Sequence, residues 1–366
     1  MLPETEPRRK PRRLGLFGPF VALLIAAAAW SGGWYWLKGK VEGQMDAVAA
    51  QAKASGGELS WKTRTVGGFP FRMDVNLTGA RAADGSGWSI EIPDLRGEAY
   101  PYSLNHWVFE APGGATVMRP RVGFTPVMAC APGQPCGNAV PMGGDVSITG
   151  QVLRASVVVE KDQPFPRISL EGVKLTFVTP TGADLFWMQS VEHLEAHFRP
   201  GPNDQGALLI RLDGAKPRLT GLVARIAQDK PVNVVWDSTF TRASALKGRD
   251  WPTAIKSWRA AGGLLTISPS TNILAGDALF AVKSGELGVD GDGRLTGHLD
   301  TELKEAPRAL AALAQTGAVD PATATAAAVT AATEQDASQT FKALLLFEDG
   351  KTKLGPLPLM ESPRVY

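Results

Sequence analysis

Two histidines and a glutamate in the run His193-Leu-Glu-Ala-His197 are residue types that bind metals. Imidazole nitrogens together with a carboxylate form a common zinc ligand set. In a β-strand these three side chains share one face, but His193 and His197 are two side-chain repeats, or about 13 Å, apart. A helix would bring them together, yet the His-Glu-x-x-His order of zinc proteases is absent. We therefore expect the polar face of a strand and no metal site.

The run Asp290-Gly-Asp292-Gly resembles the start of a calcium-binding loop. Such a loop needs oxygen ligands at its fifth and twelfth positions, which are Arg294 and Thr301 here. The arginine cannot supply that ligand. The two glycines and the flanking alternating residues are instead typical of a β-hairpin turn.

Two short matches to catalytic or cofactor motifs also lack their partners. Ser244-x-x-Lys247 has the spacing of an acylating serine, but neither Lys-Thr-Gly nor Ser-Asp-Asn accompanies it. The glycines Gly291, Gly293 and Gly297 miss the dinucleotide spacing by one residue and open no predicted helix. We expect no catalytic residues and no cofactor, so the protein is predicted not to be an enzyme.

Basic residues are concentrated at the N-terminus. Five of the 38 lysines and arginines lie in the first thirteen positions: Arg8, Arg9, Lys10, Arg12 and Arg13. Without them, and without Glu4 and Glu6, 33 basic and 34 acidic residues remain in the rest of the chain. Nucleic-acid binding requires a surplus of positive charge against phosphates, so the body is not expected to bind nucleic acid.

The segment after this basic tail is predicted to be a membrane anchor. Leu14 to Leu37 contains no charged residue, and as a helix it would be about 36 Å long, enough to cross a bilayer. Trp30, Trp34, Tyr35 and Trp36 lie towards its end, where aromatic rings favour the membrane interface. The basic residues 1–13 fix a cytoplasmic N-terminus by the positive-inside rule, which places the body outside.

A cleaved signal peptide is the alternative for this segment. Residues 8–13 would then be its basic region, Leu14–Ile25 its apolar region and Ala27–Ala29 its cleavage site. Apolar and aromatic residues continue beyond the alanines, which favours an uncleaved anchor. Both interpretations export the body to an oxidising compartment, where the neighbouring Cys130 and Cys136 are expected to form a disulfide.

The body is predicted to begin with a membrane-proximal helix over residues 38–57. Val41, Met45, Val48 and Ala52 recur at helical spacing, and two glycines follow. The periodicity then changes to two, as in Met73-Asp-Val75-Asn-Leu77, Trp88-Ser-Ile90-Glu-Ile92 and Ile168-Ser-Leu170. Such alternation is typical of antiparallel strands with one apolar and one polar face.

The predicted fold class is therefore mainly β, an extended or curled antiparallel sheet preceded by one transmembrane helix. We divide the body into a first β-rich half, 58–200, and a second, 201–366. Helices are expected near 251–261, 305–316 and 320–335, each with an early proline. The chain is predicted to close with a hairpin whose strands are Phe341–Glu348 and Thr352–Leu359, joined by Asp349-Gly350.

One motif, Gly67-Gly68-Phe69-Pro70-Phe71-Arg72, is predicted to be structural. The glycines permit a tight bend, the proline ends strand pairing, and the phenylalanines anchor the bend in the core. Arg72 is expected to cap exposed carbonyls; contact with a lipid phosphate is the alternative.

Three features together resemble a known bacterial family. They are Val66–Arg72, the run Ala99-Tyr-Pro-Tyr-Ser-Leu-Asn-His-Trp107, and the closing Leu354-Gly-Pro-Leu-Pro-Leu359, all after an N-terminal anchor. The family is the uncharacterised domain of unknown function 2125, and it is similar in style to AsmA-like proteins. The resemblance implies an inner-membrane helix, a β-rich body in the Gram-negative periplasm, and no known catalytic residues.

Two functions are compatible with these expectations. The first is binding of a lipid or another hydrophobic ligand along a groove of the sheet. The second is a non-enzymatic envelope scaffold that binds a protein partner through strand edges or helices. An apolar sheet face that stays open favours the first, and a closed core favours the second.

Overall fold

The structure is a computed structural model that describes residues 14–85, 87–119, 144–180, 186–218, 222–317, 319–336, 339–355 and 357–366. The basic tail 1–13 and both cysteines, Cys130 and Cys136, lie outside the described residues. The topology and disulfide predictions that rest on them therefore stay predictions.

Helix α1 (Leu14–Ala54) joins the predicted anchor and the predicted membrane-proximal helix without a break. Gly56 follows in a left-handed conformation with φ +82°, which a glycine adopts without strain and which ends the helix. Among the described residues, one helix, Phe17–Ala54, is long and apolar enough to cross a membrane. Its first half is exposed, with Phe20, Leu24 and Ile25 about two-thirds accessible.

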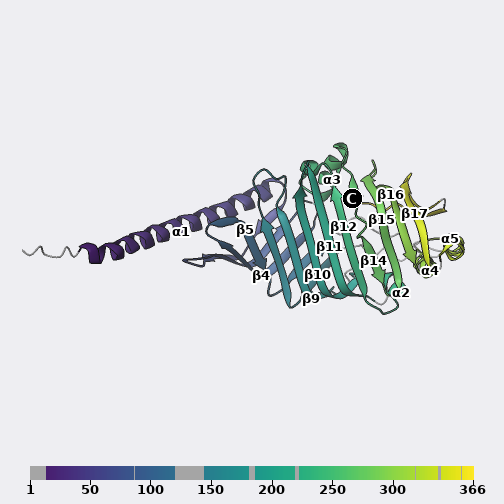
Figure 1. Cartoon of the computed structure of the whole chain (residues 1–366), viewed down its shortest axis with the longest axis horizontal. Helices are drawn as coiled ribbons and strands as arrows, with labels where there is room; N and C mark the ends of the chain where they lie inside the picture. The colour runs from purple at the N-terminus through teal and green to yellow at the C-terminus, as the bar shows by residue number, and fades with distance from the viewer. Residues whose placement is uncertain are drawn as a thin grey trace, which may run out of the picture.

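The described strands form one antiparallel sheet of nineteen strands (Figure 1). The first six are β1 (Glu58–Ser60), β2 (Thr63–Gly67), β3 (Met73–Ala83), β4 (Ser89–Tyr100), β5 (Ser103–Glu110) and β6 (Ala115–Arg119). The middle six are β7 (Gly144–Thr149), β8 (Val152–Val158), β9 (Arg167–Val178), β10 (Met188–Gly201), β11 (Gln205–Pro217) and β12 (Val232–Phe240). The last seven are β13 (Leu265–Ile267), β14 (Asn272–Ala275), β15 (Ala278–Val289), β16 (Leu295–Lys304), β17 (Thr340–Glu348), β18 (Lys351–Leu354) and β19 (Leu357–Glu361).

At several positions in this sheet, two short strands take the place of one long strand and both pair with the same neighbour. β1 and β2 both pair with β3, β5 and β6 both pair with β4, and β7 and β8 both pair with β9. β13 and β14 likewise lie together between β12 and β15. Apart from the pairing of β5 with β8, the remaining neighbours follow chain order, so most of the sheet is a long meander. The predicted fold class, an antiparallel sheet after one N-terminal helix, is confirmed.

The boundary that we drew near residue 200 falls in the tight hairpin between β10 and β11, which pair along most of their length. The described strands on both sides of it belong to the same sheet.

Left-handed residues inside three strands shift the alternation of side chains. Gly79, Lys174 and Gly214 have φ values of +55°, +50° and +66°. A residue in this conformation kinks a strand and changes which face the following side chains occupy. A separate expectation is wrong at the start of β4. Ser89 is buried while Trp88 and Ile90 are exposed, the reverse of the predicted arrangement.

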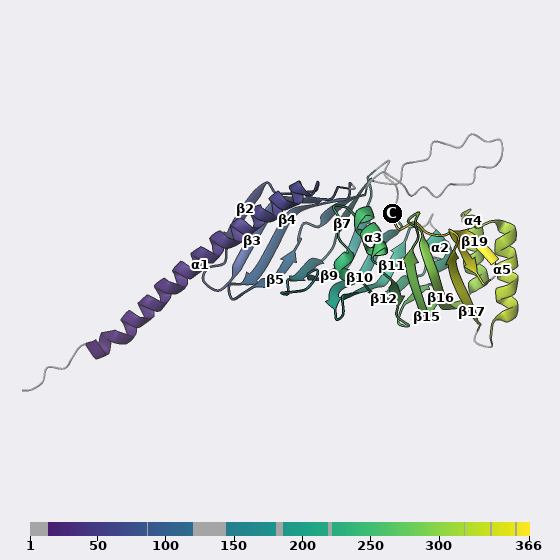
Figure 2. The same ribbon diagram turned by 90° about the horizontal axis from the view of Figure 1, so that it is seen from above.

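In the described part of the chain, five helical segments besides α1 lie beside the sheet: α2 (Leu222–Ala227), the 3-10 turn η1 (Ala243–Ala245), α3 (Trp251–Ala260), α4 (Ala306–Gln315) and α5 (Pro321–Glu334). The three predicted helices are confirmed as α3, α4 and α5. The Asp250 carboxylate accepts a hydrogen bond from the Thr253 amide at the start of α3, and Asp320 does the same for Thr323 in α5. Figure 2 shows α1 at one end of the molecule and α4 and α5 at the other.

The predicted closing hairpin forms between β17 and β18 around Asp349-Gly350, but its second strand is shorter than predicted. That segment divides into β18 and β19, which pair with each other. Gly355 follows β18 with φ +56°, a conformation suited to the reversal between them.

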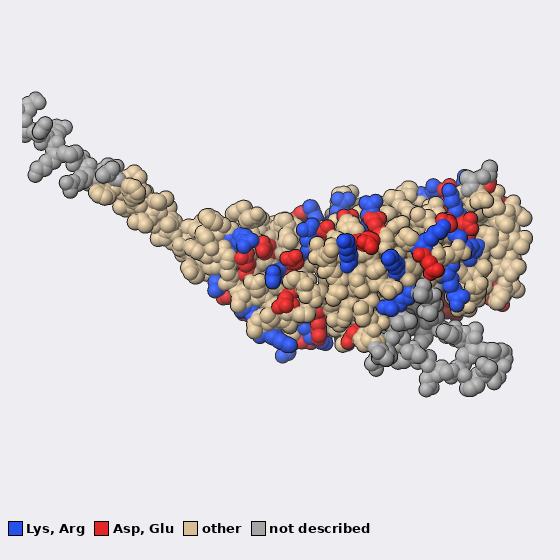
Figure 3. All heavy atoms as spheres, turned by 90° about the horizontal axis from the view of Figure 1, so that it is seen from below, with Lys and Arg blue, Asp and Glu red and all other residues tan. Residues whose placement is uncertain are grey.

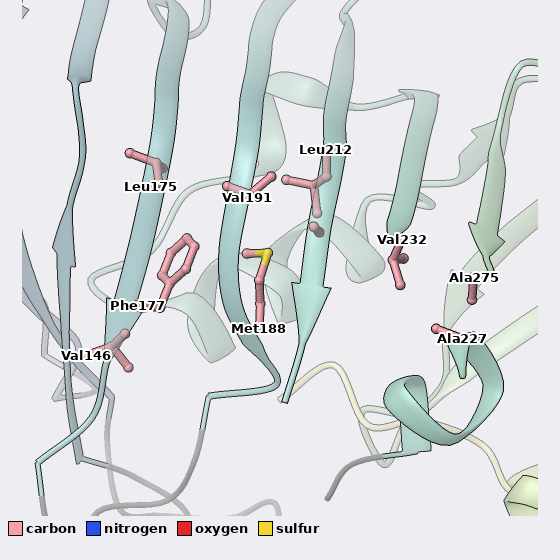
Figure 4. Packing of buried hydrophobic residues seen from close by; sticks show 10 residues of the cluster. Val146, Leu175, Phe177, Met188, Val191, Leu212, Ala227, Val232 and Ala275 are labelled. Atoms are coloured by element: carbon pink, nitrogen blue, oxygen red, sulfur yellow. The ribbon is translucent and has the colours of Figure 1, made fainter. Parts of the chain in front are cut away.

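The buried residues form separate clusters spaced along one face of the sheet. α1 packs on β2 and β3, α2 packs against β9 to β12, and α4 with α5 packs on β17 and β18. Figure 4 shows the middle cluster, in which Leu175, Val191 and Leu212 from adjacent strands lie side by side. We call the face that carries these clusters the inner face.

Candidate functional site: the inner face and the helix junction

Six inner-face side chains form a continuous apolar line across six adjacent strands. They are paired in register in the order Phe109, Ala155, Leu170, Ala196, Ile210 and Trp236. We call this line the central ladder. At the usual spacing of strands it is about 24 Å long.

Every member of the central ladder remains partly accessible. Leu170 is 43% exposed, and the other five are half-buried. Most apolar residues at the centre of a sheet face are fully buried, so an unbroken row of partly exposed apolar residues is unusual. The described residues therefore leave an apolar strip open on the inner face.

Helical elements bound the strip at both ends of its strands. At one end, α3 and η1 cover an aromatic cluster in which Phe198 stacks on Phe165 at 4.4 Å and on Phe240 at 5.7 Å. At the other end, α2 closes the middle cluster with Ile226 and Ala227. Figure 1 places α3 and α2 at opposite ends of β10 to β12, so the central ladder lies between two helical walls.

The opposite, outer face of the same strands is polar. The Arg154 guanidinium pairs with the Glu171 carboxylate at 2.5 Å, and the hydrogen bond from Arg154 lowers the pKa of Glu171. Val108 is an apolar exception, 41% exposed, paired with Glu98 and Ser156. The sheet thus separates an apolar inner face from a charged outer face.

The predicted metal-ligand candidates lie on this outer face, on one strand as expected. His193 is 3.5 Å from Glu171 and 3.8 Å from Glu195, while His197 contacts the Ser169 hydroxyl at 3.0 Å. Over the described part of the chain, no group of three or more His, Cys, Asp or Glu residues has a geometry that could hold a metal ion.

Two further motif fragments are structural. Asp290 lies in the turn between β15 and β16, as predicted, and its carboxylate accepts hydrogen bonds from the amides of Asp292 and Arg294. The Ser244 hydroxyl donates to the Asp204 carboxylate at 2.9 Å. This hydrogen bond within a turn explains the position of the serine without a catalytic role.

The predicted bend at residues 67–72 docks against α1. The Trp34 indole donates a hydrogen bond of 2.9 Å to the Arg72 carbonyl, and the Trp30 indole donates one of 3.0 Å to the Pro70 carbonyl. The Phe69 ring packs edge-on against Trp34, with ring centroids 5.5 Å apart. Gly68 has φ +94°, and a Cβ atom there would come within 2.8 Å of the Arg72 carbonyl oxygen.

Arg72 behaves differently from our expectation. Its guanidinium contacts the carboxylates of Glu98 at 3.1 Å and Asp74 at 3.5 Å instead of capping carbonyl groups. Both phenylalanines were expected in the core, but Phe69 is half exposed and Phe71 is 74% exposed.

The predicted anchor residues divide between two environments. Trp34 is only 4% exposed and Leu37 packs beside it on the first strands, so both contact the body. Tyr35 and Trp36 remain more than 60% exposed, and the Lys40 ammonium lies 4.9 Å from the Trp36 ring. The sequence could not separate these roles because Trp34, Tyr35 and Trp36 are all aromatic residues with an apolar ring and a polar group.

These features define a class of protein: a long antiparallel sheet, partly covered by helices on one face and continuous with one apolar N-terminal helix. The chain belongs to the bacterial family described as uncharacterized protein conserved in bacteria (DUF2125), whose model matches residues 34–363. The resemblance drawn from the sequence motifs is thereby confirmed. No curated protein and no solved structure matches the chain.

Proposed function

We propose that this protein binds the acyl chain of a lipid, or another long apolar ligand, along the central ladder. The observation that carries the proposal is the unbroken, partly exposed apolar row on six adjacent strands. Each fully buried methylene contributes about 0.8 kcal/mol, so a chain laid along the row gains enough to offset several kcal/mol of lost freedom.

The proposal also states where in the cell the protein is located. α1 crosses the bacterial inner membrane with the basic tail in the cytoplasm, and the body lies in the periplasm of a Gram-negative envelope. The long axis of the sheet continues away from α1 in both views (Figures 1 and 2). A ligand on the inner face would therefore be held at some distance from the bilayer.

The protein would act by binding, without catalysis and without a cofactor. Among the described residues the inner-face strip is lined by hydrocarbon and aromatic side chains, which suit an acyl chain and supply no nucleophile or proton donor.

Mass spectrometry of lipids retained by the full-length protein tests the proposal. The protein would be extracted gently from its membrane and compared with an unrelated single-span membrane protein of similar size. Retention of one or two lipids per chain above the control supports the proposal. Retention equal to the control overturns it and favours the alternative, an envelope scaffold whose strand edges or helices bind a protein partner.

A further inference from the structure

Four exposed aromatic side chains converge next to α1 from three separate parts of the chain. They are Trp30 in α1, Phe71 in the turn between β2 and β3, and Tyr100 and Tyr102 around the turn between β4 and β5. We call them the tip cluster. Together they line an open hollow of about 430 Å³, and the two tyrosine rings stack at 5.2 Å.

Two rings of the tip cluster are largely exposed and are not needed to fill the core. Phe71 is 74% and Tyr102 is 78% accessible, although both rings belong to turns that are otherwise held in place. Pro101 between the tyrosines is buried. A contiguous exposed group of large aromatic rings is typical of a surface that contacts another apolar phase.

The length of α1 places this cluster at a particular depth. About 20 helical residues cross the hydrocarbon core, so a span that begins at Leu14 ends near Gly33. Trp30 lies within one helical turn of that point. The Trp30 indole donates a hydrogen bond to the Pro70 carbonyl, and the Trp34 indole donates one to the Arg72 carbonyl. These two bonds fix the Phe71 turn at the same depth as Trp30.

The composition of both turns suits that depth. Residues 67–71 and 100–103 contain no charged side chain. The charged residues nearest to them in the sequence, Arg72 and Glu98, pair with each other. Tyrosine and tryptophan favour the membrane interface because their rings combine an apolar body with a polar group. In Figure 3 the junction of α1 with the body is free of charged side chains on the face shown, and charged residues begin farther along the body.

We propose that the tip cluster is a second membrane contact, inserted into the outer interface of the bilayer that α1 crosses. The cluster is continuous with the exposed surface of α1, and α1 is proposed to cross the bilayer. The same bilayer is therefore the partner that contacts the cluster. Two contacts fix the body against rotation about a single helix and hold the first edge of the sheet at the membrane. The inference rests on the anchoring role proposed for α1 and not on the ligand of the inner face.

Photo-crosslinking in the full-length protein tests this contact. A benzophenone side chain would replace Phe71 or Tyr102 in protein reconstituted into phosphatidylethanolamine and phosphatidylglycerol vesicles. Leu24 in α1 provides the positive control. Val329 in α5, 58% exposed at the far end of the molecule, provides the matched negative control.

We expect lipid adducts at positions 71 and 102 about tenfold above those at position 329, with the label on acyl-chain carbons. Adduct levels equal to position 329, or adducts to a second copy of the chain, would overturn the proposal. Loss of adducts at position 24 as well would instead show that α1 does not cross the bilayer. Because positions 71 and 102 are mostly exposed, the substitutions should leave folding intact, which a thermal unfolding curve would verify.

Discussion

The indole nitrogen of Trp34 lies 2.9 Å from the carbonyl oxygen of Arg72, 38 residues away, and donates a hydrogen bond to it. This bond joins the apolar helix to the first bend of the sheet. Because Trp34 is 4% exposed and contacts Phe69 edge-on, the junction is a packed interface and not a flexible tether.

Replacement of Trp34 should therefore destabilise the body. Trp34→Ala is expected to lower the free energy of unfolding by about 3–5 kcal/mol through lost packing. Trp34→Phe, which retains a ring but removes the donor, should cost about 1–3 kcal/mol. Denaturant titration of the protein in detergent micelles measures both. Trp36→Ala, at a position 63% exposed, is the control and should change the value by less than about 0.5 kcal/mol.

The bend offers a second test with an adjacent control. Gly68→Ala places a Cβ atom within 2.8 Å of backbone and of the Asp74 carboxylate, at φ +94°. We expect a loss of about 1–3 kcal/mol in unfolding free energy. Gly67→Ala meets nothing within 4 Å and should be nearly neutral. Equal effects of the two substitutions would contradict the proposed requirement for a left-handed residue.

The pairing of Glu171 with Arg154 predicts a pH dependence. The hydrogen bond from Arg154 lowers the pKa of Glu171 below its ordinary value of 4.5. A carboxylate with a lowered pKa in the folded state adds stability above its unfolded pKa and loses it as the pH falls through the folded value. Glu171→Gln should remove this contribution, so the stability difference from the wild type should shrink below about pH 4. Melting temperatures between pH 3 and 7 provide the measurement.

The cysteine prediction concerns a segment outside the described residues. If the body is exported, Cys130 and Cys136 should resist alkylation in protein taken from the envelope and react only after reduction. Free-thiol labelling followed by mass spectrometry checks this, and labelling of both thiols before reduction would refute it.

The sequence predicted the main architecture because its signals are local. An uncharged run of 24 residues, period-two alternation and proline-started helices identified α1, the antiparallel sheet and α3 to α5. The six-residue α2 was missed because it is shorter than two helical turns and carries little periodicity.

The sequence predicted the type of candidate site but not the residues that form it. The sequence indicated an apolar sheet face, but it could not identify the central ladder, because register depends on tertiary pairing. Left-handed residues at Gly79, Lys174 and Gly214 shift the alternation, and a lysine in that conformation has no sequence signal. The docking of Trp34 was also hidden, since an aromatic residue at the end of an apolar helix suits the membrane interface equally well.

Two exposed apolar residues on opposite faces provide the sharpest test of the proposed ligand strip. Leu170 lies in the central ladder and is 43% exposed, while Val108 lies on the outer face and is 41% exposed. Leu170→Glu would bring an unpaired carboxylate against a bound acyl chain, and desolvating that charge costs more than 1.4 kcal/mol, or about tenfold in affinity. We therefore expect lipid retention to fall about tenfold in Leu170→Glu and to stay unchanged in Val108→Glu. Because both side chains are partly exposed, the two variants should unfold within about 0.5 kcal/mol of the wild type. Equal retention in the two variants would separate lipid binding from the inner face and leave the central ladder without a ligand.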